Sequence, residues 1–199
     1  YVNNNSRDWI SNIIEQNNIN ADLLSATTNE IDAVRETDLS LICVGTPNRS
    51  DGQLDLKHIF TCARNIGYAL KAKNTYHTVV IRSTVSPGTN LQVGEIISEA
   101  SGKLRGKSFD IISNPEFLRE GSAVKDYFNP PVTILGANQG SKSIQSMKEL
   151  YGSFPSEIAV VEISVAEMIK YVSNSWHALK IVFANEVGNI CKSLNIDSH

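Results

Sequence analysis

The chain has 199 residues, of which 41% are hydrophobic and 20% are charged, and its formal net charge is −3. This composition is typical of a globular protein with a sizeable core. It offers no basic surplus for nucleic acid and no apolar run long enough to span a membrane, so neither is an expected partner. Cys43, Cys62 and Cys191 are widely spaced, which indicates reduced thiols of a cytoplasmic protein and no metal site.

Strands and helices alternate along the chain. Nearly continuous apolar runs predict strands that are buried on both faces at residues 39–44 and 77–82. Further strands are predicted at residues 24–27, 109–113, 132–135 and 158–161. Amphipathic runs between them predict helices at residues 30–36, 56–72, 86–101, 141–151 and 164–194. This alternation predicts an α/β fold with a doubly wound, Rossmann-like parallel sheet and right-handed crossovers.

Local residue choices predict where two of the helices begin. Asp55 is placed to cap the helix at residues 56–72. Ser86 followed by Pro87 fits an N-cap and a first helical position, and the backbone amides of that helix start would favour an anion.

Three predicted strand ends carry side chains that can meet a ligand, and ligands in doubly wound sheets lie beyond such ends. Thr46 and Thr84 follow the strands at residues 39–44 and 77–82. Their hydroxyls suit a ribose or a phosphate, although turn chemistry alone also explains both threonines.

Two carboxylates follow the strand at residues 109–113. Glu116 and Glu120 would share one side of a helical turn, where a carboxylate near a lysine acts as a base or activates water. The alternative is that one caps a turn and the other is a surface charge. Arg119, between them, is expected to be a structural partner.

The longest predicted helix, at residues 164–194, has two distinct sides. Ser164 and Glu167 have the spacing of a capping box at its start. The side expected to be buried consists of Met168, Val172, Ser175, Leu179, Val182, Phe183 and Ile190.

Lys170, Asn174 and His177 share the opposite side of this helix, one or two turns apart. They form either an ordinary exposed face or a site. In the second interpretation, Lys170 stabilises negative charge on a substrate oxygen and Asn174 positions the reacting group.

Four segments, in this order, resemble the nucleotide-sugar 6-dehydrogenases, which comprise the UDP-glucose and GDP-mannose dehydrogenases. They are Leu41-Ile42-Cys43-Val44-Gly45-Thr46-Pro47, Arg82-Ser83-Thr84-Val85, Asn114-Pro115-Glu116-Phe117-Leu118-Arg119-Glu120-Gly121, and Ala166-Glu167-Met168-Ile169-Lys170-Tyr171 with Asn174. Within this family, Trp176-His177-Ala178-Leu179-Lys180 followed by Phe183-Ala184-Asn185-Glu186 is most similar to the GDP-mannose 6-dehydrogenases.

The resemblance implies an NAD-dependent double oxidation of a sugar C6 hydroxymethyl to a carboxylate, such as GDP-mannose to GDP-mannuronate, through a cysteine thiohemiacetal and thioester. It implies that Thr46 and Thr84 contact NAD and that Glu116 assists proton transfer or the hydrolytic water. The residues that it implies as substrate contacts are Glu120, Lys170, Asn174 and His177, with Lys170 and Asn174 also catalytic. A homodimer formed through the central helix is expected.

The family's glycine fingerprint, G-x-G-x-x-G, and its Gly-Gly-Ser-Cys segment do not occur in this sequence. The chain is therefore expected to be an internal fragment, inactive alone. Residues 1–162 would form a partial NAD-binding domain that lacks its first β-α-β unit, and residues 163–199 the first long helix of a central dimerisation domain.

Three alternatives stay open at this point. One is a UDP-glucose 6-dehydrogenase. Another is a β-hydroxyacid dehydrogenase of the 6-phosphogluconate type, which is disfavoured because its usual Lys-x-x-Asn spacing differs from that of Lys170 and Asn174. The third is a non-catalytic module that binds or assembles around a nucleotide sugar.

Overall fold

The computed structural model describes residues 25–119 and 121–197, and it contains one five-stranded sheet in the order β1-β2-β3-β4-β5. The strands are β1 (Leu39–Ile42), β2 (His77–Ile81), β3 (Phe109–Ser113), β4 (Thr133–Gly136) and β5 (Ile158–Val161). The helices are α2 (Glu30–Glu36), α3 (Lys57–Leu70), α4 (Thr89–Ser101), α5 (Ala123–Phe128), α6 (Lys142–Tyr151) and α7 (Ile163–Ser193). The predicted α/β fold class is confirmed, while residues 25–27 form no strand.

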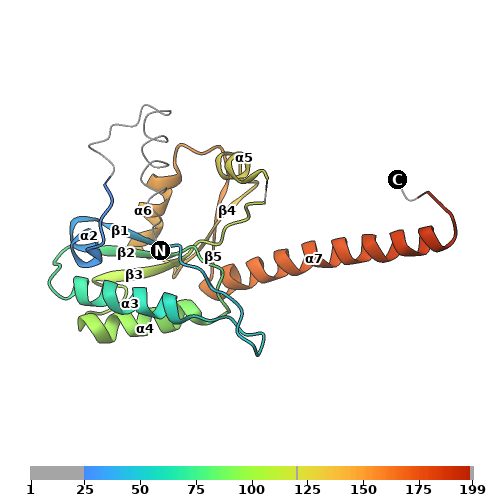
Figure 1. Ribbon diagram of the computed structural model, residues 1–199. Helices are drawn as coiled ribbons and strands as arrows, with labels where there is room; N and C mark the ends of the chain where they lie inside the picture. The colour runs from blue at the N-terminus through green and yellow to red at the C-terminus, as the bar shows by residue number, and fades with distance from the viewer. Residues whose placement is uncertain (1–24, 120, 198–199) are drawn as a thin grey trace.

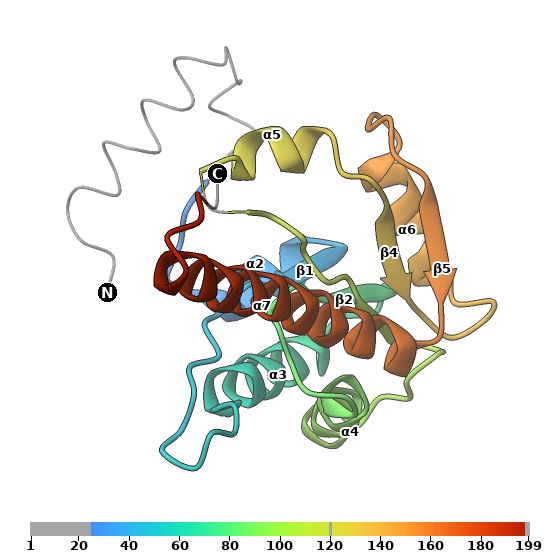
Figure 2. The same cartoon turned by 90° about the vertical axis from the view of Figure 1, so that its right-hand side faces the viewer.

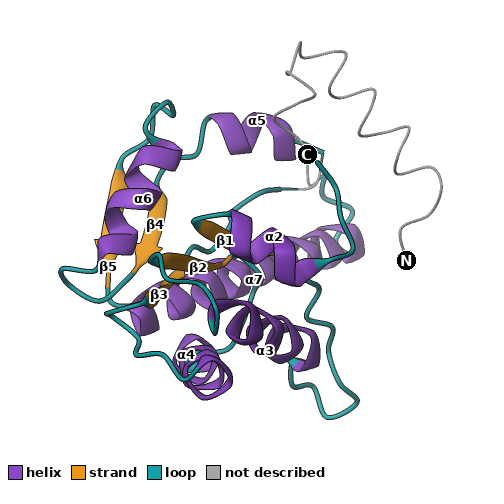
Figure 3. Ribbon diagram, turned by 90° about the vertical axis from the view of Figure 1, so that its left-hand side faces the viewer, coloured by secondary structure: helices purple, strands orange, loops and turns teal. Residues whose placement is uncertain are grey.

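Helices cover both faces of the sheet (Figure 1). All five residues of β2 are buried. Val79 and Ile81 pack into the core beneath α3 and α4, whereas Val80 belongs to a second core with Met147 of α6. Figure 3 shows α6 on the side of the sheet opposite α3 and α4. Two buried faces explain the apolar runs of β2, β3 and β4, whose residues are all buried. Strand β1 was also expected to be buried on both faces, but it is only partly covered and Leu41 is 43% exposed, so that prediction was wrong.

The sheet is mostly parallel, but it contains one antiparallel junction. Strands β1, β2 and β3 pair in parallel, as do β4 and β5. Strand β3 meets β4 antiparallel through a single pair, Ser113 with Gly136. The expectation of a sheet parallel throughout was wrong here, because a parallel crossover usually carries a helix packed against the sheet. In the part of this connection that the structure describes, the one helix is α5, and none of its six residues is buried.

Two helix starts differ from their predictions. Leu56 is the N-cap of α3, although the Asp55 carboxylate accepts a bond from the Lys57 amide at 2.9 Å. Helix α4 has Gly88 as its N-cap, with a φ of 92°, so the predicted start at Ser86 was wrong.

Helix α7 leaves the body of the protein after its first turns and projects away from it (Figure 1). Its buried residues are Ala166, Glu167 and Lys170. The side that we expected to be buried is exposed, so that prediction was wrong: Met168 is 50% exposed, Val172 60% and Phe183 69%. The amphipathic pattern identified an apolar side but not which part of the helix the sheet covers.

Gly136 lets the start of α7 approach the sheet closely. A Cβ at this position would lie 2.5 Å from the Ala166 Cβ and 3.0 Å from the Ser113 Cβ. Helix α7 therefore passes over the junction between β3 and β4, which brings its first turns to the carboxyl end of β3.

Candidate active site at the strand ends

The carboxyl ends of β1 and β2 lie side by side and bring the two predicted cofactor-binding threonines together. Ile42 pairs with Ile81 at the ends of these strands, so the loops that follow them are neighbours. The Thr46 hydroxyl donates to the Thr84 carbonyl at 2.8 Å. Both threonines are half-buried.

This edge of the sheet fits the dinucleotide that the resemblance implies. A Cβ added at Gly45 would meet no atom within 4 Å, so the backbone there is open to a ligand. The Ser83 hydroxyl donates to the Val44 carbonyl at 2.6 Å and ties the two loops together. Hydroxyls on such an edge can bond ribose hydroxyls and phosphate oxygens.

Two of the three cysteines lack the features of an activated nucleophile. Cys43, Cys62 and Cys191 are all free. Burial raises the pKa of the Cys43 thiol, and the positive charge of Arg82 only partly opposes this. Burial also raises the pKa of Cys62. A raised pKa lowers the fraction of reactive thiolate, so neither of these two thiols has the properties of a catalytic nucleophile.

The loop after β3 starts from a buried amide. Asn114 is 1% exposed, and its side chain donates to the Ile134 carbonyl at 2.9 Å. Its side-chain oxygen accepts from the Arg82 guanidinium at 2.9 Å and from the Tyr151 hydroxyl at 2.7 Å. Burial raises the pKa of Tyr151 and so keeps this donor protonated. These bonds fix the backbone two residues before Glu116.

Lys170 of α7 meets Glu116 at the carboxyl end of β3. The Lys170 ammonium is 3.1 Å from one oxygen of the Glu116 carboxylate, and the lysine is only 6% exposed. The other carboxylate oxygen accepts a bond from the Leu118 amide at 2.7 Å. The ammonium also lies 5.5 Å from the centre of the Phe117 ring. Two predicted catalytic residues, distant in sequence, are therefore in direct contact.

A hollow of about 570 Å³ lies beside this ion pair, between α7 and the segment that follows β3. Lys170, Asn174 and His177 line its α7 side, and Arg119 and Asp126 line the opposite wall. The polar line predicted on α7 therefore faces a cavity of ligand size, where an ordinary exposed face was the alternative.

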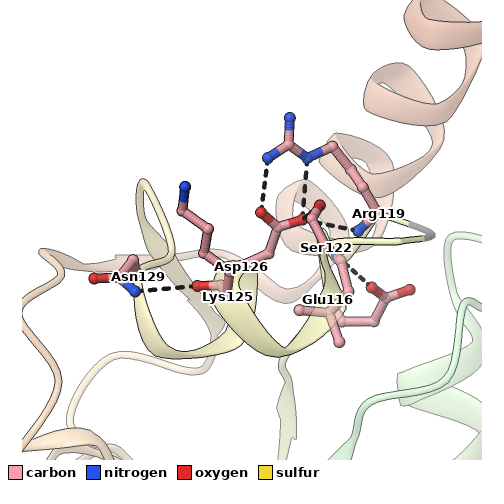
Figure 4. Close-up of polar contacts among 7 residues, drawn as sticks. Glu116, Arg119, Ser122, Lys125, Asp126 and Asn129 are labelled. Atoms are coloured by element: carbon pink, nitrogen blue, oxygen red, sulfur yellow. Dashed lines mark hydrogen bonds and ion pairs between the residues drawn. The ribbon is translucent and has the colours of Figure 1, made fainter.

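Arg119 is held by Asp126 of α5 (Figure 4). Its guanidinium donates to the two carboxylate oxygens at 3.0 and 2.7 Å, and its backbone amide adds a third bond at 3.1 Å. These bonds from Arg119 hold the pKa of Asp126 well below its usual range, and Asp126 in turn raises the pKa of Arg119. Arg119 is thus a structural partner that fixes one wall of the hollow.

The remaining predicted substrate contact, Glu120, lies outside the described residues. Residues 114–119 contain no helical turn, so the helical spacing assumed for Glu116 and Glu120 is not observed in the part that the structure describes.

Glu167 does not take part in the predicted capping box. The N-cap of α7 is Glu162, and it makes no side-chain capping bond. Glu167 instead reaches helix α4, where its carboxylate accepts bonds from the Gly88 amide at 2.8 Å and the Asn90 amide at 2.9 Å. The anion-binding position predicted at the start of that helix is therefore occupied by the Glu167 carboxylate.

The sequence reasoning missed two groups that shape this site. Asn114 opens the Asn-Pro-Glu segment, but its partners Arg82, Ile134 and Tyr151 are too far along the chain for a local pattern to show. Asp126 lies seven residues after Arg119 in a helix that the sequence analysis did not predict. An arginine followed by an acidic residue is too common a pattern to have identified this pair.

Within residues 25–119 and 121–197, no group of three or more His, Cys, Asp or Glu side chains is placed to hold a metal ion. Over the same residues, no helix combines the length and the apolar character needed to cross a bilayer.

Comparison with known proteins gives consistent matches along the chain. Residues 10–155 match the model of the UDP-glucose/GDP-mannose dehydrogenase family, NAD binding domain, and residues 164–199 match the central domain of that family. A GDP-mannose 6-dehydrogenase of Pseudomonas syringae pv. tomato is 48% identical over 176 residues, which is 87% of this chain and 40% of that protein. A UDP-glucose 6-dehydrogenase of Haloferax volcanii is 41% identical, over 89% of this chain and 42% of that protein.

The solved structures agree with these matches. The GDP-mannose dehydrogenase of Pseudomonas aeruginosa, solved as a ternary complex, superposes with a TM-score of 0.85 at 46% identity and covers 88% of this chain and 40% of that one. A UDP-glucose dehydrogenase from Pyrobaculum islandicum gives a TM-score of 0.82 at 40% identity, with the same coverage. The chain spans about 40% of the length of the relatives that it matches.

Proposed function

The chain belongs to the UDP-glucose/GDP-mannose dehydrogenase family, and on that premise we propose that the protein is an NAD-dependent nucleotide-sugar 6-dehydrogenase. The reaction would convert the C6 hydroxymethyl of the sugar to a carboxylate. This four-electron oxidation adds one water and reduces two NAD per sugar. GDP-mannose is the proposed substrate, because the GDP-mannose relative is the more similar of the two compared above, at 48% against 41% identity.

The contact between Lys170 and Glu116 carries this proposal. An oxidation at C6 develops negative charge on oxygen, and a lysine ammonium that is almost fully buried stabilises such charge far better than it would in water. Glu116 lies 3.1 Å from that ammonium, where its carboxylate can hold or pass on a proton from the sugar hydroxyl or from water. Asn174 lies one turn beyond Lys170 on the same side of α7 and is proposed to orient the reacting group.

The other site residues are proposed to bind the two ligands. NAD would accept hydride from the substrate carbon. Thr46 and Thr84 are its proposed contacts, because both lie at the open edge beyond β1 and β2. His177, together with Asn174, lines the 570 Å³ hollow and is a proposed substrate contact. Glu120 is a proposed contact on the strength of the family motif.

Domain division and assembly are proposals as well. We place the boundary between residues 162 and 163, which lies in the interval between the end of the NAD binding domain match at residue 155 and the start of the central domain match at residue 164. The exposed apolar side of α7 supports a homodimer formed through that helix. The free cysteines support a cytoplasmic location.

UDP-glucose is the second candidate substrate, favoured by the relative of Haloferax volcanii that is 41% identical. The test is to express the protein from its complete open reading frame and to follow NADH formation with GDP-mannose and with UDP-glucose. We expect kcat/KM for GDP-mannose to exceed that for UDP-glucose by about tenfold or more, because buried polar groups that match one substrate are left unpaired by another. The reverse order would assign the enzyme to UDP-glucose, and no NADH with either sugar would contradict the proposal in favour of a non-catalytic module.

The same assay tests the role of Lys170. Lys170→Gln should lower kcat about 10²- to 10³-fold, because the amide carries no charge to stabilise the oxyanion. Lys180→Gln is the matched control on the same helix, since the Lys180 ammonium lies 5.7 Å from the Trp176 ring centre and away from the hollow. Equal activities of the two variants would remove Lys170 from the mechanism.

A further inference from the structure

Glu167 joins the start of helix α7 to the start of helix α4. The residue is 3% exposed, and its carboxylate accepts three hydrogen bonds, from the N-cap of α4 and from one residue of its first turn. One carboxylate oxygen accepts from the Gly88 amide at 2.8 Å. The other accepts from the Asn90 backbone amide at 2.9 Å and from the Asn90 side-chain amide at 2.7 Å. Figure 2 shows the first turns of α7 near α4.

These bonds place a negative group at the positive end of a helix. The first amides of a helix have no partner within the helix itself, and the helix dipole favours an anion beside them. Helix α4 has no side-chain capping bond from its own N-cap, Gly88. Glu167 supplies that function from a different part of the chain, so the two helix starts are held in a fixed relation.

Each of the two helix starts continues directly into the candidate site. Lys170, whose ammonium contacts Glu116 at 3.1 Å, follows Glu167 by three residues, which is close to one helical turn. On the other side, Thr84 lies four residues before Gly88, and its carbonyl accepts the Thr46 hydroxyl at 2.8 Å. A single buried carboxylate therefore connects the proposed cofactor loops with the helix that carries the proposed catalytic lysine.

We propose that Glu167 is a positioning residue, which sets the place of the Lys170 ammonium relative to Glu116 and to the loop of Thr84. Glu167 acts through α4 and α7, since its own carboxylate is occupied by Gly88 and Asn90 and is turned to that helix. This inference rests on the proposed function, because its consequence is an alignment of the two proposed binding regions.

Glu167→Gln tests the inference in the protein expressed from its complete open reading frame. The glutamine turns an N–H₂ group toward amides that are themselves donors, so at least one bond is replaced by a repulsive contact and the first turn of α7 must shift. A displacement of about 1 Å can cost about a hundredfold in rate. We expect kcat per folded molecule to fall about tenfold to hundredfold, while KM for the nucleotide sugar changes less than about threefold.

Glu162→Gln is the matched control, because Glu162 is exposed at the start of the same helix and makes no side-chain capping bond there. It should keep the wild-type kcat. A purely structural role of Glu167 would reduce the folded fraction and leave kcat per folded molecule unchanged, which would overturn the proposal.

Asn90→Ala provides a second, milder variant in case Glu167→Gln does not fold. It removes one donor to the same carboxylate and keeps the two backbone bonds, so kcat should fall about threefold to tenfold. Because both changes act on one contact, the double variant should be no slower than Glu167→Gln alone. Wild-type kcat in Asn90→Ala, or effects that multiply in the double variant, would contradict the proposal.

Amide hydrogen exchange separates a failure of this inference from a failure of the proposed function. Glu167→Gln should speed exchange at Gly88, at Asn90 and in residues 166–170 by about tenfold or more, whether or not the protein turns over a sugar. Unchanged exchange at both helix starts would overturn the positioning role. Faster exchange in a protein that reduces no NAD would leave the contact established and reject only the function.

Discussion

Two buried titratable side chains, Lys73 and His77, show how a few contacts set the charge state of a buried group. The Lys73 ammonium, in a residue only 7% exposed, donates to the carbonyls of Val34 at 3.2 Å and Arg35 at 3.0 Å, and also to that of Thr37. The ammonium thereby supplies hydrogen bonds to carbonyls at the end of α2, and it places a positive charge near His77. His77 is fully buried, and this burial, followed by the charge of Lys73, lowers its pKa from 6.5 to about 4.

The lowered pKa of His77 predicts a loss of stability in mild acid. Below pH 6.5 the unfolded chain binds a proton at this histidine that the folded protein does not bind, down to about pH 4. The contribution is therefore fully present above pH 6.5 and declines by up to about 1.4 kcal/mol per pH unit as the pH falls toward 4. Urea unfolding at pH 7, 5.5 and 4.5 measures this slope.

His77→Gln should flatten that slope, because glutamine does not titrate and can still bond the Ser40 hydroxyl, which lies 2.9 Å from the His77 ring. His58→Gln is the control, since His58 is an exposed residue of α3, and it should keep the wild-type slope. A His77→Gln slope equal to that of the wild type would mean that the acid sensitivity has another source.

At the scale of the helices and strands, close packing at Gly136 is what brings α7 onto the sheet. Gly136→Ala would place a Cβ 2.5 Å from the Ala166 Cβ and 3.0 Å from the Ile163 Cα, so the helix has to move. We expect the free energy of unfolding to fall by about 1–3 kcal/mol, as for other overpacked cores. Chemical denaturation measures this change.

Gly188→Ala, in α7 itself, is the control for that experiment. A Cβ there meets nothing within 4 Å, and alanine favours a helix more than glycine does, so stability should stay equal or rise by about 0.5–1 kcal/mol. If Gly136→Ala were equally harmless, the close approach of α7 to the sheet would not be needed for stability.

The sequence predicted those elements whose signal is local. β2 and β3 were identified because both faces of each strand are buried, which leaves a continuous apolar run. The antiparallel entry of β4 was missed, since strand direction depends on how the preceding connection packs. The capping box failed for a related reason: Glu167 found its partners in α4, a distant part of the chain.

The candidate site was predictable to a similar extent. A position directly after a predicted strand was enough to place Thr46, Thr84 and Glu116 beyond the carboxyl ends of β1, β2 and β3. Helical spacing was enough to place Lys170 and Asn174 on one side of α7, where both line the same hollow. The buried amide of Asn114 and the ion pair of Arg119 with Asp126 were not predictable, because each depends on contacts formed only after the elements have packed.

At the scale of the whole molecule, the main feature is an apolar surface along the projecting part of α7. Its exposed side chains are Val172, Trp176, Leu179, Val182, Phe183 and Ile190. A contiguous apolar side of this kind marks an interaction surface in a water-exposed protein. It is the surface through which we propose that two copies associate.

Paired charges on that surface should therefore separate the copies. Leu179→Asp with Phe183→Asp buries two carboxylates in the proposed interface, so we expect the dimer dissociation constant to rise about a hundredfold or more. Sedimentation equilibrium measures this directly. Leu104→Asp is the control, because Leu104 is 68% exposed and lies outside α7. Unchanged association of the α7 variant would place the interface elsewhere.

Strands β3 and β4 are joined by a single residue pair, so the backbone pairing of the sheet is weakest between them. Strands β1, β2 and β3 lie on one side of this junction, and β4 and β5 lie on the other. Besides the pair of Ser113 with Gly136, the Asn114 side chain crosses the junction and donates to the Ile134 carbonyl. A graft that exchanges residues 131–161 for the equivalent stretch of a relative thus has little backbone pairing to reproduce. Its success should depend on retaining a glycine at position 136, a free carbonyl opposite Asn114 and the Tyr151 hydroxyl that donates to the Asn114 side chain.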